Sequence, residues 1–144
     1  MSALYDPQDR GFPDVFTTID RAQIAMLRDL ASAEARLILK GGMAMRVVVG
    51  SMRLTKDIDF DRAAGVSTNA VKASVRKALT HGAQSARLLG SQVDELKVTP
   101  TTVRMRLAGT ASGTPVKFVV EVSGRSAPAD GSYMRVTVTP PSRY

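Results

Sequence analysis

Two aspartates separated by one apolar residue, Asp57 and Asp59, are the part of this sequence best suited to chemistry. On a β-strand both carboxylates point to one face, about 7 Å apart, while Ile58 and Phe60 point to the other face. The apolar neighbours indicate a strand that is at least half buried. Two hard oxygen ligands at this spacing can share one or two divalent cations, as in two-metal phosphoryl transfer. Because two buried like charges are costly without a cation, the pair predicts a metal site.

A pair of glycines precedes these aspartates. Gly41 and Gly42 are separated from Asp57 by 14 residues and follow a short apolar run. Successive glycines at a strand-to-helix turn let backbone N–H groups approach a phosphate, and the helix N-terminus favours an anion. A plain tight turn is the simpler alternative, and it would be preferred without the aspartates downstream. With them, a phosphate-binding turn is the better interpretation.

Two further carboxylates lie in strand patterns. Asp61 continues the face of Asp57 and Asp59, and we expect it to extend into solvent or to cap the next turn. Glu121 is the only acid between residues 95 and 130, and valines flank it in the alternating run 116–122. It is placed either to complete a metal site or activate a hydroxyl, or to face water on an edge strand. Strand position alone does not separate these two alternatives.

The first half of the chain is expected to supply the elements that hold these residues. Residues 1–16 show no periodicity and predict an irregular arm. Thr17 or Thr18 can cap a helix that runs to about Glu34. Leu37 to Leu39 predicts a short buried strand, and residues 43–49 favour a helix after the glycine turn. A strand is expected through residues 57–61.

The second half predicts one helix and three strands. Ser67 is a good cap for a helix that ends near Gly82. Residues 83–93 give no clear pattern, whereas the runs 101–107 and 116–122 alternate as a hairpin joined by the loop 108–115. A last strand is expected over residues 133–138. The element order is typical of an α+β fold with a mixed sheet flanked by helices, and residues 17–144 are predicted to form one domain.

The composition indicates which partners the protein can bind and which kinds of metal or catalytic site are improbable. The net charge is +7, with an excess of six positive charges over residues 71–117, which favours a polyanion such as RNA or a triphosphate as readily as it favours general solubility. The chain has no cysteine and one histidine, His81, which argues against thiolate or His-rich metal sites and a Ser-His-Asp triad. We expect no membrane span and no signal peptide, in keeping with the cytoplasm.

The segments Lys-Gly-Gly-Met-Ala at 40–44 and Arg-Leu-Thr-Lys-Asp-Ile-Asp-Phe at 53–60 resemble the nucleotidyltransferase AbiEii/AbiGii toxin family, a branch of the polymerase-β-like nucleotidyltransferases. The resemblance covers residues 36–62 and extends to about residue 123. It implies a polymerase-β-like core that uses Mg²⁺ or Mn²⁺ to transfer a nucleoside monophosphate from an NTP to RNA, with tRNA as the expected acceptor. It also implies a toxin with a cognate antitoxin protein.

The same resemblance implies roles for individual residues. Asp57 and Asp59 would hold metal, Glu121 would act as base or third ligand, and Gly41 with Gly42 would bind the triphosphate. Six further side chains are candidates for contacts with the nucleotide or RNA: Lys40, Arg53, Thr55, Arg104, Arg106 and Lys117. Strand alternation places Thr55 and Arg53 on the face of Asp57. The basic residues on the run 101–107 are otherwise simply its solvent face.

One departure from the family pattern leaves the activity of the chain open. The family usually continues past the third carboxylate into a helical half, whereas this sequence stops at Tyr144 after Pro140-Pro141. The sequence is then a minimal version of the family, a fragment, or a domain that needs a partner. The corresponding functions are an enzyme active in this short form, a non-catalytic module that binds RNA or nucleotide, and a subunit whose partner completes the active site.

Overall fold

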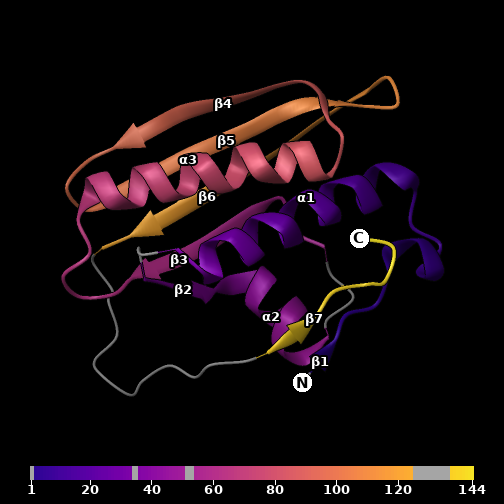
Figure 1. The fold of residues 1–144 in the computed structure, drawn as a ribbon, viewed down its shortest axis with the longest axis horizontal. Coiled ribbons are helices and arrows are strands. Elements are labelled where there is room, and N and C mark those ends of the chain that lie inside the picture. Colours follow the sequence, from indigo (N-terminus) through magenta and orange to yellow (C-terminus); the bar gives the residue numbers. More distant parts are fainter. Residues whose placement is uncertain (1, 34–35, 51–53, 125–136) are drawn as a thin grey trace.

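A mixed five-stranded sheet covered on one face by two long helices forms the body of the molecule (Figure 1). The computed structural model describes residues 2–33, 36–50, 54–124 and 137–144. The sheet has the order β2-β3-β6-β5-β4, in which β3 and β6 are parallel and every other pair is antiparallel. The α+β class with a mixed sheet is confirmed. The elements are β1 (Ser2–Ala3), a 3-10 helix (Pro7–Arg10), α1 (Asp14–Ala31), β2 (Leu37–Lys40), α2 (Gly41–Val49), β3 (Asp57–Arg62), α3 (Thr68–Ser85), β4 (Leu89–Val98), β5 (Thr102–Ala111), β6 (Thr114–Ser123) and β7 (Val138–Thr139).

The hydrophobic core lies between the sheet and helices α1 and α3, which pack against each other on the same face (Figure 1). Alternate residues of β3, β5 and β6 are buried there, including Ile58, Met105 and Val120. Their neighbours along each strand point to the opposite face, which is polar. The strand pattern therefore directs most apolar side chains to the helices and most charged side chains to the open face, with the buried Arg62 at the end of β3 as an exception.

Helix α1 begins earlier than the sequence pattern predicts. It starts at Asp14, directly after Pro13, so neither Thr17 nor Thr18 is its N-terminal cap. Proline at this position is compatible with a helix start because its φ is already close to the helical value. Thr17 is instead buried within the helix. The division of the chain at residue 16 stays a prediction.

Helix α3 continues past Gly82 to Ser85, so Gly82 does not end it. A Cβ atom at Gly82 would lie 2.6 Å from the carbonyl oxygen of Ala22 on α1. The glycine therefore permits close packing of two helices rather than a left-handed helix end.

The β5–β6 hairpin is confirmed, and it is longer than expected. The two strands continue to Ala111 and Thr114, so Ser112 and Gly113 alone form the turn. Both turn residues have positive φ, 50° and 80°, which suits the twist of a two-residue hairpin.

Strand β4 was not anticipated: it begins at Leu89, within the segment 83–93 that gives no clear pattern, and continues to Val98. It is an edge strand, exposed along most of its length, and its pairing with β5 shifts register twice. Register shifts and exposure on both faces remove the alternation by which a strand is recognised.

Most of the last predicted strand, residues 133–138, lies outside the described residues. The short strand β7 pairs in parallel with β1, so the two ends of the chain form a second, two-stranded sheet. Among the described residues, no helix combines the length and apolar character needed to cross a membrane.

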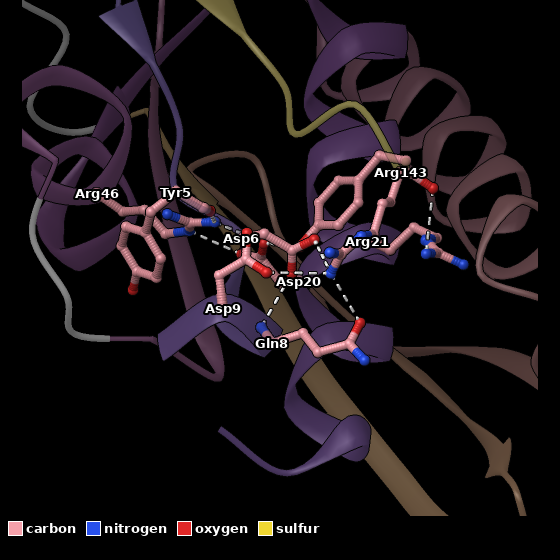
Figure 2. A network of polar contacts seen from close by, with 9 residues as sticks. Tyr5, Asp6, Gln8, Asp9, Asp20, Arg21, Arg46 and Arg143 are labelled. Carbon is pink, nitrogen blue, oxygen red and sulfur yellow. Dashed lines mark hydrogen bonds and ion pairs between the residues drawn. The ribbon is translucent and has the colours of Figure 1, made fainter. Parts of the chain in front are cut away.

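A network of polar side chains fixes these ends to α1 and α2 (Figure 2). Arg46 and Asp20 are both buried, and the guanidinium donates from Nε to Oδ1 at 2.7 Å and from Nη2 to Oδ2 at 2.6 Å. The hydroxyl of Tyr144 also donates to Asp20 Oδ2. Burial, together with this hydrogen bond, raises the pKa of Tyr144, so its hydroxyl stays protonated as the donor. We call Asp20, Arg46 and Tyr144 the Asp20 network.

Candidate active site

The open face of the sheet brings the predicted carboxylates together. Along β3 the core-facing residues are buried, whereas Asp57 is exposed and Asp59 is partly exposed. Because β3 and β6 run parallel in register, Asp59 lies directly opposite Glu121. Residues opposite each other on adjacent strands project to the same face, about 5 Å apart at the backbone. Two acids distant in sequence are thus neighbours.

The register extends this pair into a line of charges across all five strands. Lys40 pairs with Asp59, Asp59 with Glu121, Glu121 with Arg104, and Arg104 with Lys97. We call these five residues the charged row. Its two acids are central and its three cations are peripheral, so positive charge surrounds the pair of carboxylates without lying between them.

The electrostatics at Asp59 reflect this placement. Burial is the main cause that raises the pKa of Asp59, and the negative charges of Glu121 and then Asp57 add to it. Lys40 and Arg104 act in the opposite direction and do not cancel the rise. A carboxylate whose anionic form is disfavoured by neighbouring carboxylates is a place where a cation is stabilising.

The flanking cations already hold two of the acids. Arg104 Nε donates to Glu121 Oε2 at 2.7 Å, and Lys40 Nζ lies 2.7 Å from Asp61 Oδ1. Asp61 therefore neither extends freely into solvent nor caps the next turn, contrary to the expectation from its position. Within the described residues, no three acidic or histidine side chains stand close enough together to enclose one metal ion. Asp57, Asp59 and Glu121 nonetheless supply hard oxygen donors on one face, which is the donor set that Mg²⁺ and Mn²⁺ prefer.

The glycine turn lies directly against this centre. Helix α2 starts at Gly41, two residues earlier than predicted, and no side chain caps its N-terminus. Gly41 has a φ of +72°, and a Cβ atom there would lie 3.2 Å from Asp59 Oδ2. At Gly42 a Cβ atom would lie 3.6 Å from Thr55 Oγ1. Gly41 thus brings the uncapped N-terminus of α2 beside the Asp59 carboxylate, and Gly42 lies beside Thr55. An anion bound to a metal at Asp59 would be stabilised by this helix N-terminus.

Thr55 lies before the strand rather than on its face. Strand β3 begins at Asp57, and the Thr55 hydroxyl donates to the Asp57 carbonyl at 2.8 Å while accepting from the Asp57 N–H at 3.2 Å. The prediction from alternation is therefore wrong for Thr55, because a local side-chain turn replaces the extended backbone. Arg53, assigned to the same face, lies outside the described residues.

Sequence reasoning did not identify Gln23, which forms a hydrogen bond to the backbone of the turn at Thr55. Gln23 is buried on α1 and its Nε2 donates to the Thr55 carbonyl at 2.7 Å. The available signal was an amide next to the apolar residues Ala22 and Ile24 in a helix, since a buried amide needs a partner. A cavity of about 70 Å³ lies beside Gln23. Its lining consists of Phe16, Ile19, Asp20, Gln23, Leu54, Thr55 and Lys56. Because ligand pockets begin at about 300 Å³, this cavity is too small for a nucleotide.

The remaining basic candidates lie on neighbouring rows of the open face. Arg106 Nη2 donates to Asp94 Oδ2 at 3.0 Å and lies opposite Val119 rather than Glu121. Lys117 is exposed and pairs with Ala108. Of the predicted cations, Lys40 and Arg104 thus contact carboxylates of β3 and β6, while Arg106 and Lys117 stand one or two rows away.

Comparison with solved structures shows a shared fold. The chain is similar to a Helicobacter pylori protein assigned as a nucleotidyltransferase, with 19% identity, a TM-score of 0.66, and coverage of 87% of this chain and 52% of that one. It is also similar to JHP933 from Helicobacter pylori, with 21% identity, a TM-score of 0.56, and coverage of 78% and 46%. For MenT4, a nucleotidyltransferase toxin from Mycobacterium tuberculosis, the identity is 21%, the TM-score 0.50, and the coverage 77% and 38%.

The chain therefore spans about half the length, or less, of the solved structures that it matches. A search of curated proteins gave no match. Residues 25–142, most of the chain and all of the charged row, match the family described as "Nucleotidyl transferase AbiEii toxin, Type IV TA system". On this match, the chain belongs to the AbiEii nucleotidyltransferase toxin family.

Proposed function

We propose that the protein is a Mg²⁺- or Mn²⁺-dependent nucleotidyltransferase that moves a nucleoside monophosphate from an NTP to a hydroxyl of RNA. The observation that carries this proposal is the position of Asp59, which lies between Glu121 and the uncapped glycine turn. Two acids and an uncapped glycine turn therefore lie next to one another, and the proposal assigns them to binding of metal and of phosphate. That combination is what phosphoryl transfer requires.

Each group has a distinct task in this reaction. Asp57 and Asp59 would hold the divalent cation, which when bound neutralises charge on the transferring phosphate. Gly41 and Gly42 would orient the triphosphate through backbone N–H groups. Glu121 would complete the metal shell or accept the proton of the attacking hydroxyl. The hydroxyl oxygen bonds to the α-phosphorus as the bond to pyrophosphate breaks, so pyrophosphate leaves.

The acceptor is proposed to be RNA, with tRNA first. The excess of Lys and Arg over residues 71–117 favours a polyanion. Arg104, Arg106, Lys117 and Lys40 lie on the face that carries Asp59, where they are placed to contact the triphosphate or RNA. With only seven aromatic residues in the chain, contact with RNA is expected to be mainly electrostatic rather than by base stacking.

Family membership supports further proposals about context. We propose that the protein acts in the cytoplasm as the toxin of a toxin–antitoxin pair and that a cognate antitoxin protein neutralises it. Residues 17–144 would act as the single nucleotidyltransferase-like domain of this toxin.

The direct test is incorporation of label from each of the four NTPs into total tRNA with Mg²⁺. The wild-type chain should transfer label, and Asp57→Ala should abolish transfer because it removes one metal ligand. Asp94→Ala, on the same open face but outside the centre, is the matched control and should retain most of the activity. Transfer that persists undiminished in Asp57→Ala would refute the site.

A second candidate is favoured by the observation that, within the described residues, no three acidic or histidine side chains stand close enough together to enclose one metal ion. The protein would then be a binding module, or a subunit whose partner completes the substrate site. Salt-sensitive RNA binding without transfer, unchanged by Asp57→Ala, would indicate a binding module. Activity that appears only after addition of a neighbour-encoded protein would indicate a subunit.

A further inference from the structure

We propose that Arg104 is an exchangeable counter-ion at the active site, which holds Glu121 in the metal-free protein and binds the triphosphate once metal has taken Glu121. This inference rests on the proposed function, because it assigns a second role to a residue of the same centre. It makes Arg104 the residue that couples metal binding to nucleotide binding.

The first step in the argument is the geometry of the Arg104–Glu121 pair. Both Nε and Nη2 of Arg104 converge on the same oxygen, Glu121 Oε2. The Arg46–Asp20 pair instead uses two nitrogens and two oxygens. Paired, parallel hydrogen bonds are the stronger arrangement between a guanidinium and a carboxylate. Arg104 thus holds Glu121 by one oxygen and is the easier of the two arginines to displace.

The second step is accessibility. The side chains of Arg104 and Glu121 retain 42% and 34% of their exposure, so both can be rehydrated during an exchange of partners. Ion pairs this exposed are weak, because water screens the attraction. A divalent cation with Asp57 and Asp59 as additional ligands can therefore compete for Glu121.

The third step is the fate of Arg104 after release. On its other side Arg104 lies opposite Lys97, a like charge. Without Glu121, two neighbouring cations would face the open side of the sheet, and an incoming polyphosphate would be stabilised there. Arg104 therefore opposes metal binding on its own and favours binding of metal together with triphosphate. Such coupling is reciprocal by thermodynamic linkage.

The experiment measures Mn²⁺ binding by titration calorimetry for the wild type, Arg104→Gln and Arg106→Gln. Arg106 is the matched control, since it lies on the same strand and face but pairs with Asp94. Arg104→Gln should bind Mn²⁺ about threefold to tenfold more tightly than the wild type, because Glu121 no longer has a competing partner. Arg106→Gln should change Mn²⁺ affinity by less than about twofold, because it removes an equal charge without releasing Glu121.

The second measurement uses inorganic tripolyphosphate with saturating Mn²⁺, which represents the part that all NTPs share. Here Arg104→Gln should bind about threefold to tenfold more weakly than the wild type. Opposite changes for metal and for tripolyphosphate are the signature of exchange. A merely structural role would weaken both.

Unchanged or weaker Mn²⁺ binding by Arg104→Gln would overturn the inference, as would an equal gain in Arg106→Gln. If wild type and Arg104→Gln both fail to bind Mn²⁺, the metal centre of the proposed function fails and the inference fails with it. Mn²⁺ binding and transfer by the wild type with no change in Arg104→Gln would refute the inference alone. Thermal unfolding should be similar for all three proteins, because both arginines are partly exposed.

Discussion

Two arginine–carboxylate pairs in this molecule have the same chemistry and opposite settings. The side chains of Arg46 and Asp20 are each 1% exposed and are joined by two parallel hydrogen bonds (Figure 2). Asp20 also accepts from Tyr144. Arg104 and Glu121 lie on the open face, joined through a single carboxylate oxygen. A buried charge must keep its partner, whereas an exposed one can exchange partners at small cost. Burial thus separates a pair that holds the fold from a pair that can serve a reaction.

Helix α2 connects these two regions. Its first residue, Gly41, lies beside Asp59, and Arg46 in its last turn is held by Asp20 on α1. Since a nine-residue helix is short and stiff, fixing one end also fixes the other. The Asp20 network therefore positions the glycine turn without contacting the charged row. Three predictions, each with a matched variant, test this contrast.

The largest expected effect is on stability at Arg46. Arg46→Met leaves Asp20 buried without its cation and should lower the free energy of unfolding by about 3–5 kcal/mol. Urea unfolding measures this, with Arg104→Gln as the matched variant, expected to lose less than about 1 kcal/mol. The double variant Asp20→Leu/Arg46→Met should recover much of the loss, because no unpaired charge remains. Equal losses for Arg46→Met and Arg104→Gln would contradict the contrast between the two pairs.

An intermediate effect is expected at the two ends of α2. Gly41 and Gly50 have φ values of +72° and +69°, but only at Gly41 would a Cβ atom approach another group, Asp59 Oδ2. Gly41→Ala and Gly50→Ala should each cost about 1–2 kcal/mol of stability through backbone strain. Only Gly41→Ala should also reduce the proposed nucleotide transfer, because the methyl group would occupy the space beside Asp59, the proposed metal ligand. If transfer falls equally in both variants, the glycine turn has no special role at the site.

The sequence predicted the features that depend on local alternation. The shared face of Asp57 and Asp59, the core-facing Ile58 and the β5–β6 hairpin all follow from a period of two. The glycine turn was placed correctly before the aspartates, although α2 starts at Gly41 itself. In each case the pattern is contained within a few residues, so the chain alone specifies it.

Features that depend on pairing between distant parts of the chain could not be predicted from local patterns. Glu121 lies opposite Asp59 only because β3 and β6, about 60 residues apart, pair in parallel with one particular register. Arg46 looked like the single polar residue of an apolar helix, and its buried partner Asp20 lies 26 residues earlier. Strand β4 could not be predicted, because its register shifts and its exposure remove the alternation of apolar and polar residues. Sequence patterns specify faces, whereas tertiary pairing decides which charged groups meet.

The smallest expected effect concerns Glu95, a carboxylate held by two cations at the surface. Arg76 Nη2 donates to Glu95 Oε1 at 3.0 Å, and Lys72 lies 3.5 Å from the same oxygen. The hydrogen bond from Arg76 is the main cause that lowers the pKa of Glu95, with the positive charge of Lys72 as a further cause.

A lowered pKa means that the folded protein favours the anion of Glu95, so the contribution of this anion to stability is complete above the ordinary pKa of glutamate. It is lost as the pH falls through the lowered value. The midpoint of thermal unfolding should therefore be slightly higher for the wild type than for Glu95→Gln at neutral pH, and this difference should vanish once the pH lies below the lowered pKa. A difference that persists unchanged at low pH would show that the glutamine variant perturbs packing, and surface ion pairs would then be no guide to the exchangeable pair at Arg104.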